Sequence, residues 1–100
     1  MKLTTDEIAA LPGQLPGWAV EGQSLVRQYV FESFPDAIGF VTRLAFDVEA
    51  ADHHPDMHLS YRQVTVRWTT HSDDGLTDKD VAGARRSDAV AHMMGSRVGG

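Results

Sequence analysis

Apolar and polar residues alternate in two pairs of short segments, one pair in each half of the chain. Residues 18–21 and 25–31 form the first pair, with a Gly-Gln-Ser turn between them, and residues 57–61 and 64–70 form the second. Alternation with a period of two places successive side chains on opposite faces of a sheet, and the β-branched and aromatic residues here favour strands. The short connections predict antiparallel pairing within each pair.

Two segments between and before these strands predict helices. Residues 4–11 begin with threonine and acidic residues, which suit a helix N-terminus, and we expect the Pro-Gly-rich segment 12–17 to end this helix. Residues 33–49 carry apolar side chains at helical spacing, and Pro35 suits the first turn. We expect the buried sides of these helices to hold Leu3, Ile8, Leu11, Ala37, Ile38, Phe40, Val41, Leu44, Ala45 and Val48.

A third helix is predicted after the second strand pair. Thr77 and Asp80 have the spacing of a capping box, in which the Asp80 carboxylate reaches back to the Thr77 backbone. Its buried side would hold Val81, Ala84, Val90 and Met94. We expect residues 95–100 to fray as a flexible tail. The order helix-strand-strand-helix-strand-strand-helix predicts a single α+β domain over residues 1–100, with helices on one face of an antiparallel sheet.

Composition narrows the possible classes of protein. The chain has 100 residues, 42% of them hydrophobic, which fits one globular domain and argues against disorder. A net charge of −5 argues against a nucleic-acid partner, and the lack of cysteine excludes disulfides, thiolate metal sites and a cysteine nucleophile. No apolar run approaches the roughly 20 residues of a membrane helix, and the N-terminus lacks a secretory signal pattern. We therefore expect a cytoplasmic protein.

Three histidines stand at positions where scaffolds often place chemistry. His53 and His54 are adjacent in a polar loop, and His71 follows the last predicted strand. Histidine has an ordinary pKa of about 6.5, so it can donate and accept protons near neutrality. Converging imidazoles suit a reaction in which one atom gains a proton while its neighbour loses one, such as the loss of water across a C–N bond.

Other interpretations of the histidines stay open at this point. The His-His-Pro loop could be a solvated loop without a role, because loops are polar in general. A zinc site could draw on His58 as well as the three histidines above, although their spacing does not match a helical His-Glu-x-x-His motif. We expect His92 to lie on the surface, and Trp18 and Trp68 to belong to the core.

An ordered set of motifs makes the chain similar to a known family. The motifs are Glu49-Ala-Ala-Asp-His53-His54-Pro55-Asp56, then Tyr61, then Thr69-Thr70-His71, and finally Gly75-Leu76-Thr77-x-x-Asp80. Together they resemble the pterin-4a-carbinolamine dehydratase family, and the resemblance extends over about residues 6–91. A His-His-Pro motif alone is a weak signal, whereas the loop, the strand-end histidine and the helix start in this order are specific.

The resemblance implies a fold and an activity. The fold is a four-stranded antiparallel sheet with three helices on one face. The activity is the dehydration of 4a-hydroxytetrahydropterin to quinonoid dihydropterin, which supports aromatic amino acid hydroxylases by recycling tetrahydropterin. Members assemble as homodimers or homotetramers, and neither a metal nor an organic cofactor is implied.

The resemblance also implies roles for particular residues. The active-site histidines would be His53, His54 and His71, and the substrate-binding positions would be Glu49, Asp80 and Met57. Asp80 is explained equally well as a helix cap, and Glu49 as a solvated carboxylate at a helix end. Met57 stands where many members have tryptophan, while Gly83 and Ser87 stand where large apolar residues are usual.

A different class of function stays open beside the enzyme. Some relatives use this fold as a scaffold, either as dimerisation partners of transcription factors or as assembly factors. A metal-dependent hydrolase is a third and smaller possibility. The histidine trio favours the dehydratase, because a scaffold has no need for it.

Overall fold

The structure is a computed structural model that describes residues 1–95, 97 and 98. In chain order its elements are α1 (Thr5–Gln14), β1 (Ala19–Glu21), β2 (Ser24–Val30), α2 (Phe34–Ala51), β3 (Asp56–Ser60), β4 (Gln63–Trp68), the 3₁₀ helix η1 (His71–Asp73), α3 (Asp78–Met93) and β5 (Arg97–Val98). The predicted order of three helices and four main strands is confirmed, and the fold is of the α+β class.

The sheet joins the two predicted strand pairs through their inner strands. Its order is β1-β2-β4-β3, and every pairing is antiparallel, with Tyr29 of β2 opposite Val64 of β4. The C-terminal segment differs in part from the expected tail, because β5 pairs with the end of β2. The remaining residues of that tail, 96, 99 and 100, lie outside the described part of the chain.

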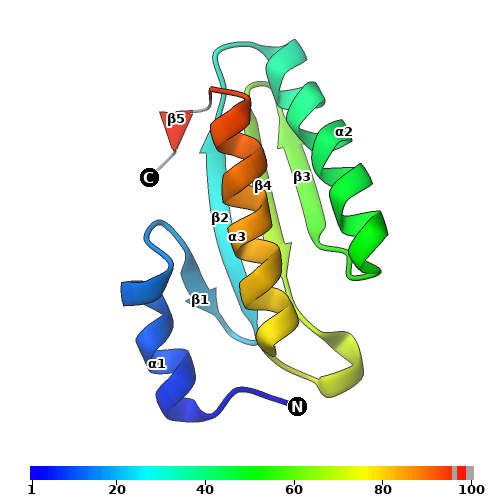
Figure 1. Cartoon of the computed structure of the whole chain (residues 1–100). Helices are drawn as coiled ribbons and strands as arrows, with labels where there is room; N and C mark the ends of the chain where they lie inside the picture. Colours follow the sequence, from blue (N-terminus) through cyan, green and yellow to red (C-terminus); the bar gives the residue numbers. More distant parts are fainter. Residues whose placement is uncertain (96, 99–100) are drawn as a thin grey trace.

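The helices cover one face of the sheet. Figure 1 shows α2 and α3 lying across this face, with α1 beside the short strand β1. Leu11 of α1 belongs to the same buried cluster as Phe40 of α2 and Val90 of α3, so all three helices share one core. The opposite face of the sheet carries polar side chains such as Gln28 and Thr65.

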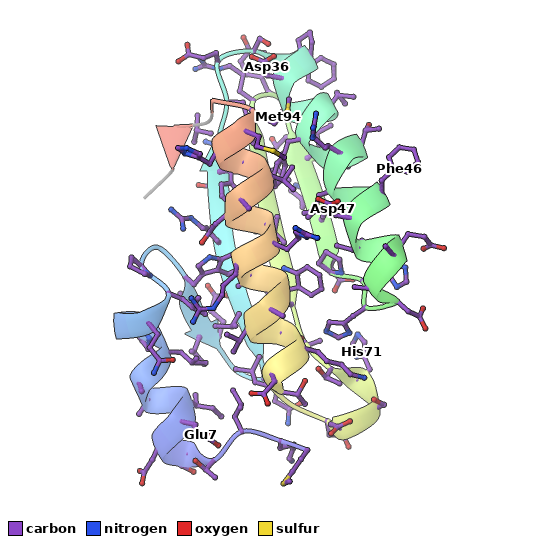
Figure 2. The ribbon with its side chains drawn as sticks, in the orientation of Figure 1. Glu7, Asp36, Phe46, Asp47, His71 and Met94 are labelled. Carbon is purple, nitrogen blue, oxygen red and sulfur yellow. The ribbon has the colours of Figure 1, made fainter. Side chains whose placement is uncertain are left out.

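The buried side of α2 is narrower than its sequence suggests. Residues 37, 40, 44 and 48 are buried, whereas Ile38 and Ala45, both expected to be buried, are exposed. Figure 2 shows that Phe46 points away from the fold, while Asp47 lies on the side of α2 that faces α3. The helix packs through a stripe three to four residues apart, and its outer side stays unpartnered among the described residues.

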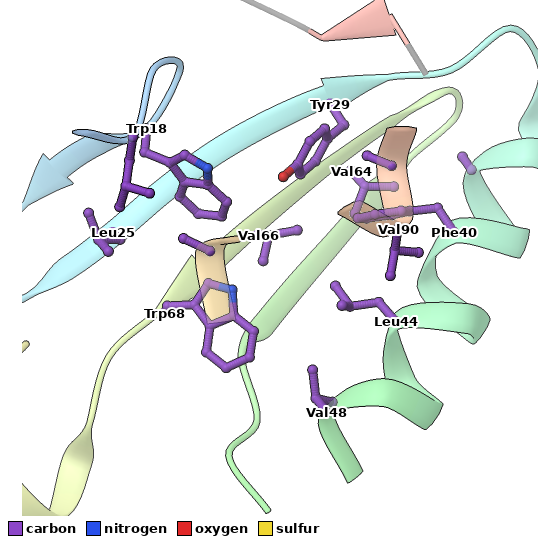
Figure 3. Close-up of a cluster of buried hydrophobic side chains, with 14 of the residues drawn as sticks. Trp18, Leu25, Tyr29, Phe40, Leu44, Val48, Val64, Val66, Trp68 and Val90 are labelled. Carbon is purple, nitrogen blue, oxygen red and sulfur yellow. The ribbon is translucent and has the colours of Figure 1, made fainter. Parts of the chain in front are cut away.

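The core lies between the sheet and the helices. Figure 3 shows Tyr29 and Val64 from the sheet meeting Phe40, Leu44 and Val90 from α2 and α3. The ring of Tyr29 lies 5.0 Å from that of Phe40, measured between centroids, in a tilted arrangement typical of aromatic pairs. The prediction that Trp18 and Trp68 are core residues is confirmed, since both are almost fully buried.

The first helix is longer at its C-terminal end than the sequence predicts. The helix does end within segment 12–17, but its expected last residue, Leu11, is wrong, because α1 continues through Pro12 to Gln14. Pro12 lies in the last turn, where its missing N–H deprives only the Ile8 carbonyl of a partner, and Leu15 closes the helix by donating its N–H to the Leu11 carbonyl at 2.7 Å.

Gly83 and Ser87 allow α3 to approach β4 closely. Both residues are buried against the indole of Trp68. Trp68 donates its Nε1–H to the Ser87 hydroxyl at 3.0 Å, and Ser87 donates in turn to the Gly83 carbonyl at 2.8 Å. These two small residues therefore accommodate a large residue on the facing strand.

Candidate active site

The predicted site residues come from four adjoining segments of the chain. The helix α2 ends at Ala51, and Asp52 closes it in the left-handed conformation with φ of 53°. The chain then passes through His53 and His54 to β3. The 3₁₀ helix η1 starts at His71, which Figure 2 places near the C-terminal end of α2.

His53 is held by the fully buried carboxylate of Asp80. Nε2 of His53 lies 2.7 Å from Oδ1 of Asp80. The other carboxylate oxygen accepts hydrogen bonds from the Thr70 hydroxyl at 2.7 Å and from the Thr77 backbone N–H at 2.9 Å. Asp80 therefore caps α3 and orients His53 at the same time. Because a carboxylate accepts hydrogen bonds, the arrangement favours the His53 tautomer that is protonated at Nε2, which leaves Nδ1 as an acceptor.

Trp68 supports the imidazole of His53 from one side. The two rings stack with centroids 5.2 Å apart and an angle of 28° between their planes. His53 retains 16% exposure of its side chain, so one edge of the ring reaches solvent. A ring fixed by a buried carboxylate and an indole, with one free edge, is preorganised for contact with a ligand.

His54 forms a second pair with Glu49, and this pair lies on the surface. Nε2 of His54 lies 2.7 Å from Oε1 of Glu49, with both side chains mostly exposed. Such a pair contributes about 1 kcal/mol at most to stability, because water screens it. Its effect is to orient the His54 ring beside the His53 loop.

The remaining predicted residues, His71 and Met57, form no hydrogen bond or ion pair with either histidine pair. His71 is exposed, and its imidazole has no hydrogen-bond partner in the part of the chain that the structure describes. It follows Thr70, whose hydroxyl binds Asp80, so the backbone that carries His71 is tied to the same carboxylate as His53. Met57 is half-buried and packs against the core.

The described residues bring together no set of side chains that could bind zinc. Within residues 1–95, 97 and 98, no group of three or more His, Cys, Asp or Glu side chains could hold a metal ion. His58 lies on β3 opposite Thr65, on the sheet face away from the helices. His92 is exposed on α3, as expected.

A cleft of about 730 Å³ opens beside His53, between α2 and α3. It is lined by Asp47, Val48, Ala50, Ala51, His53, Trp68, Lys79, Ala82, Gly83, Arg85, Arg86 and Ala89. Of the six predicted site residues only His53 takes part. The basic residues of α3 were missed, although Lys79, Ala82 and Arg86 recur at helical spacing and so share a face.

Neither of the two groups with clearly shifted pKa values, Tyr29 and Asp73, lines this cleft. Burial, and then a 2.5 Å hydrogen bond to Asp88, raise the pKa of Tyr29 far above its usual value. A hydrogen bond from the terminal amine is the largest of the contacts that lower the pKa of Asp73.

Comparison with known proteins assigns the chain to a family. The model of the family described as "Pterin 4 alpha carbinolamine dehydratase" matches residues 1–90. The chain belongs to this family. A relative from Mycobacteroides abscessus, provisionally named a pterin-4-alpha-carbinolamine dehydratase, is 48% identical over 86 residues, which cover 86% of this chain and 92% of the relative. A relative from Thermomicrobium roseum with the same provisional name is 44% identical and covers 85% of this chain and 91% of its own length.

Two solved structures share the fold of this family member. A transcriptional coactivator/pterin dehydratase from Brucella melitensis is 35% identical with a TM-score of 0.85, covering 91% of this chain and 99% of its own. A pterin dehydratase-like RuBisCO assembly factor of the alpha-carboxysome is 23% identical with a TM-score of 0.63, covering 74% of this chain and 86% of its own. In the described residues, the helices are too short or too polar to cross a membrane.

Proposed function

We propose that this protein dehydrates 4a-hydroxytetrahydropterin to quinonoid dihydropterin and water. In this reaction the C4a–O bond breaks as the hydroxyl takes up a proton and leaves as water. N5 loses its hydrogen as a proton, and a C4a=N5 double bond forms. No electrons are transferred to another compound, so the proposed reaction needs no redox cofactor.

The observation that carries this proposal is the fixed imidazole of His53. The Asp80 carboxylate and the Trp68 indole hold the ring, and its Nδ1 is left without a hydrogen-bond partner among the described residues. In the proposed mechanism His53 is the main acid/base, a role in which an oriented histidine commonly contributes about 10²–10⁴-fold to the rate. His54 and His71 would serve as the second proton carrier and as substrate-orienting groups.

The remaining predicted residues would bind the pterin. Glu49 would contact the substrate through its position beside His54, and Asp80 would act through His53 as well as by its charge. Met57 would fill the place of the tryptophan common in the family. In this proposal the enzyme is a homodimer or homotetramer that acts on the product of an aromatic amino acid hydroxylase.

The test is the absorbance-monitored dehydration of freshly generated 4a-hydroxytetrahydropterin. Wild type, His53→Ala, the His53→Ala/His71→Ala double variant and an enzyme-free blank are compared, each with and without a chelator. His92→Ala is the matched control, because His92 is exposed on α3 and belongs to neither histidine pair. We expect a chelator-resistant acceleration that falls about 10²-fold or more in the His53 variants and persists in the control. A wild-type rate equal to the blank refutes the proposal.

A second candidate is a non-catalytic binding protein on the same fold. The apolar side chains exposed on α2 favour it, because Phe34, Ile38 and Phe46 expose 46%, 40% and 76% of their surfaces. The names of the two solved structures connect this fold with a transcriptional coactivator and with an assembly factor. The dehydration assay and a pull-down together separate the two candidates. A scaffold would give a dehydration rate equal to that of the blank and would recover a stable protein partner in the pull-down.

A further inference from the structure

The cleft between α2 and α3 lies beside His53, yet the other predicted pterin-binding residues do not line it. We propose that this α2–α3 cleft binds a phosphate group at the end of the substrate's side chain at C6. The inference rests on the proposed function and narrows its substrate class to phosphorylated pterins.

The shape of the cleft suits a substituent that extends from a reacting centre at His53. Small residues of both helices line its walls, including Ala50 and Ala51 on α2 and Ala82 and Ala89 on α3. The volume of about 730 Å³ lies within the range of about 300–1,000 Å³ usual for small-molecule sites. The indole of Trp68, which packs against Gly83, also lines the cleft. A ligand that reaches His53 therefore has open space along the helices.

The charges in the cleft favour an anion. Oδ2 of Asp47 lies 3.9 Å from Nε of Arg86, so the charges of these two side chains largely cancel. The guanidinium of Arg85 and the ammonium of Lys79 have no hydrogen-bond or ion-pair partner in the described part of the chain. Asp73, whose pKa Lys79 helps to lower, is itself paired with the terminal amine at 2.9 Å. Two unpaired cations thus remain at one cleft in a chain of net charge −5.

Two positive charges of these types match a phosphate monoester better than a neutral polyol. A phosphate monoester carries about −1.5 to −2 charges at pH 7 and three acceptor oxygens. The guanidinium of Arg85 can donate two parallel hydrogen bonds to such a group, and the ammonium of Lys79 adds a point charge. Binding through a distant substituent would also help to place the reacting atoms against His53.

The test compares the affinities of two stable 7,8-dihydropterins, measured by calorimetry. One carries a neutral trihydroxypropyl side chain at C6, and the other carries the same chain with a terminal phosphate. We expect wild type to prefer the phosphorylated compound about tenfold, and the preference to shrink at high salt. Arg85→Gln should remove most of the preference. Arg43→Gln is the matched control, because Arg43 is exposed on α2 outside the cleft.

A variant that should strengthen the preference for phosphate shows that a lost preference in Arg85→Gln does not come from misfolding. Asp47→Asn removes the carboxylate that faces Arg86, so the preference for phosphate should rise severalfold. Equal affinities in wild type, or an unchanged preference in Arg85→Gln, overturn the inference. If wild type still dehydrates the neutral substrate in that case, the proposed function stands and only the phosphate site fails. If it neither binds a pterin nor accelerates dehydration, both proposals fail.

Discussion

Adding one methyl group to α3 should destabilise this protein, although alanine ordinarily stabilises a helix. A Cβ on Gly83 would lie 2.6 Å from two atoms of the Trp68 ring, about 1 Å closer than an ordinary contact between carbon atoms. The indole cannot yield easily, because it stacks on His53 and donates a hydrogen bond to Ser87.

The size of the effect follows from three contributions. Overpacking a dense core costs about 1–3 kcal/mol, and loss of the Trp68–Ser87 hydrogen bond costs about 1 kcal/mol more. The higher helix propensity of alanine offsets about 1 kcal/mol of this loss. Gly83→Ala should therefore lower the free energy of unfolding by about 2 kcal/mol, equivalent to a drop in Tm of about 10 °C for a domain of this size.

A double-mutant cycle measured by urea unfolding isolates this contact. Trp68→Leu removes the ring atoms nearest Gly83, so Gly83→Ala in that background should be neutral or stabilise by up to about 1 kcal/mol. The coupling energy would then be about 2–3 kcal/mol. Gly13→Ala is the control, since Gly13 lies in α1 with nothing within 4 Å of an added Cβ. If Gly83→Ala alone is as stable as wild type, this account of the packing of Gly83 against Trp68 is refuted.

Two further predictions concern the cluster around Asp88. Asp88→Ala should lower the free energy of unfolding, measured in urea, by about 3 kcal/mol, because it leaves the guanidinium of Arg27, only 7% exposed, without its charged partner. Glu21→Ala is the control, because it breaks an exposed ion pair and should lower the free energy of unfolding by less than about 1 kcal/mol. Burial, and then the hydrogen bond to Asp88, raise the pKa of Tyr29, so the folded state keeps a proton that the unfolded chain releases above about pH 10. The contribution of Tyr29 to the free energy of unfolding should therefore be constant below pH 10. Above pH 10 it should fall by up to about 1.4 kcal/mol per pH unit. In a Tyr61→Phe variant, where Tyr29 is the last tyrosine, tyrosinate absorbance should appear only as the protein unfolds; absorbance from folded protein contradicts the assignment.

The parts of the fold that could be predicted are those set by local sequence. The strand pairs follow from alternation and short turns, and the N-terminus of α3 follows from the Thr77–Asp80 spacing, which forms the expected capping box. The pairing of β2 with β4 depends on contacts far apart in the chain, which no local pattern specifies. The exposure of Ile38 likewise depends on where α3 lies against α2, and so could not be inferred from periodicity alone.

The candidate site could be predicted as a set of residues but not as an arrangement. The histidines were singled out by their positions, and the structure brings His53 to Asp80, 27 residues further along the chain. The stacking of Trp68 on His53 and the cleft beside them were not foreseen. Both depend on small side chains of α2 and α3 that become neighbours only after folding, whereas each helix alone shows only a scatter of alanines.

Asp80 explains why the fold and the proposed site cannot be separated in this protein. One oxygen of its carboxylate caps α3 through the Thr77 N–H and binds the Thr70 hydroxyl, and the other holds His53. A fully buried carboxylate is costly unless its hydrogen bonds are satisfied, so the cap and the strand-end threonine provide the environment in which the carboxylate can orient a histidine. His53 therefore reaches its proposed working geometry only when α3 has docked on β4. The alternatives weighed for Asp80, helix cap and site residue, are two consequences of the same set of hydrogen bonds.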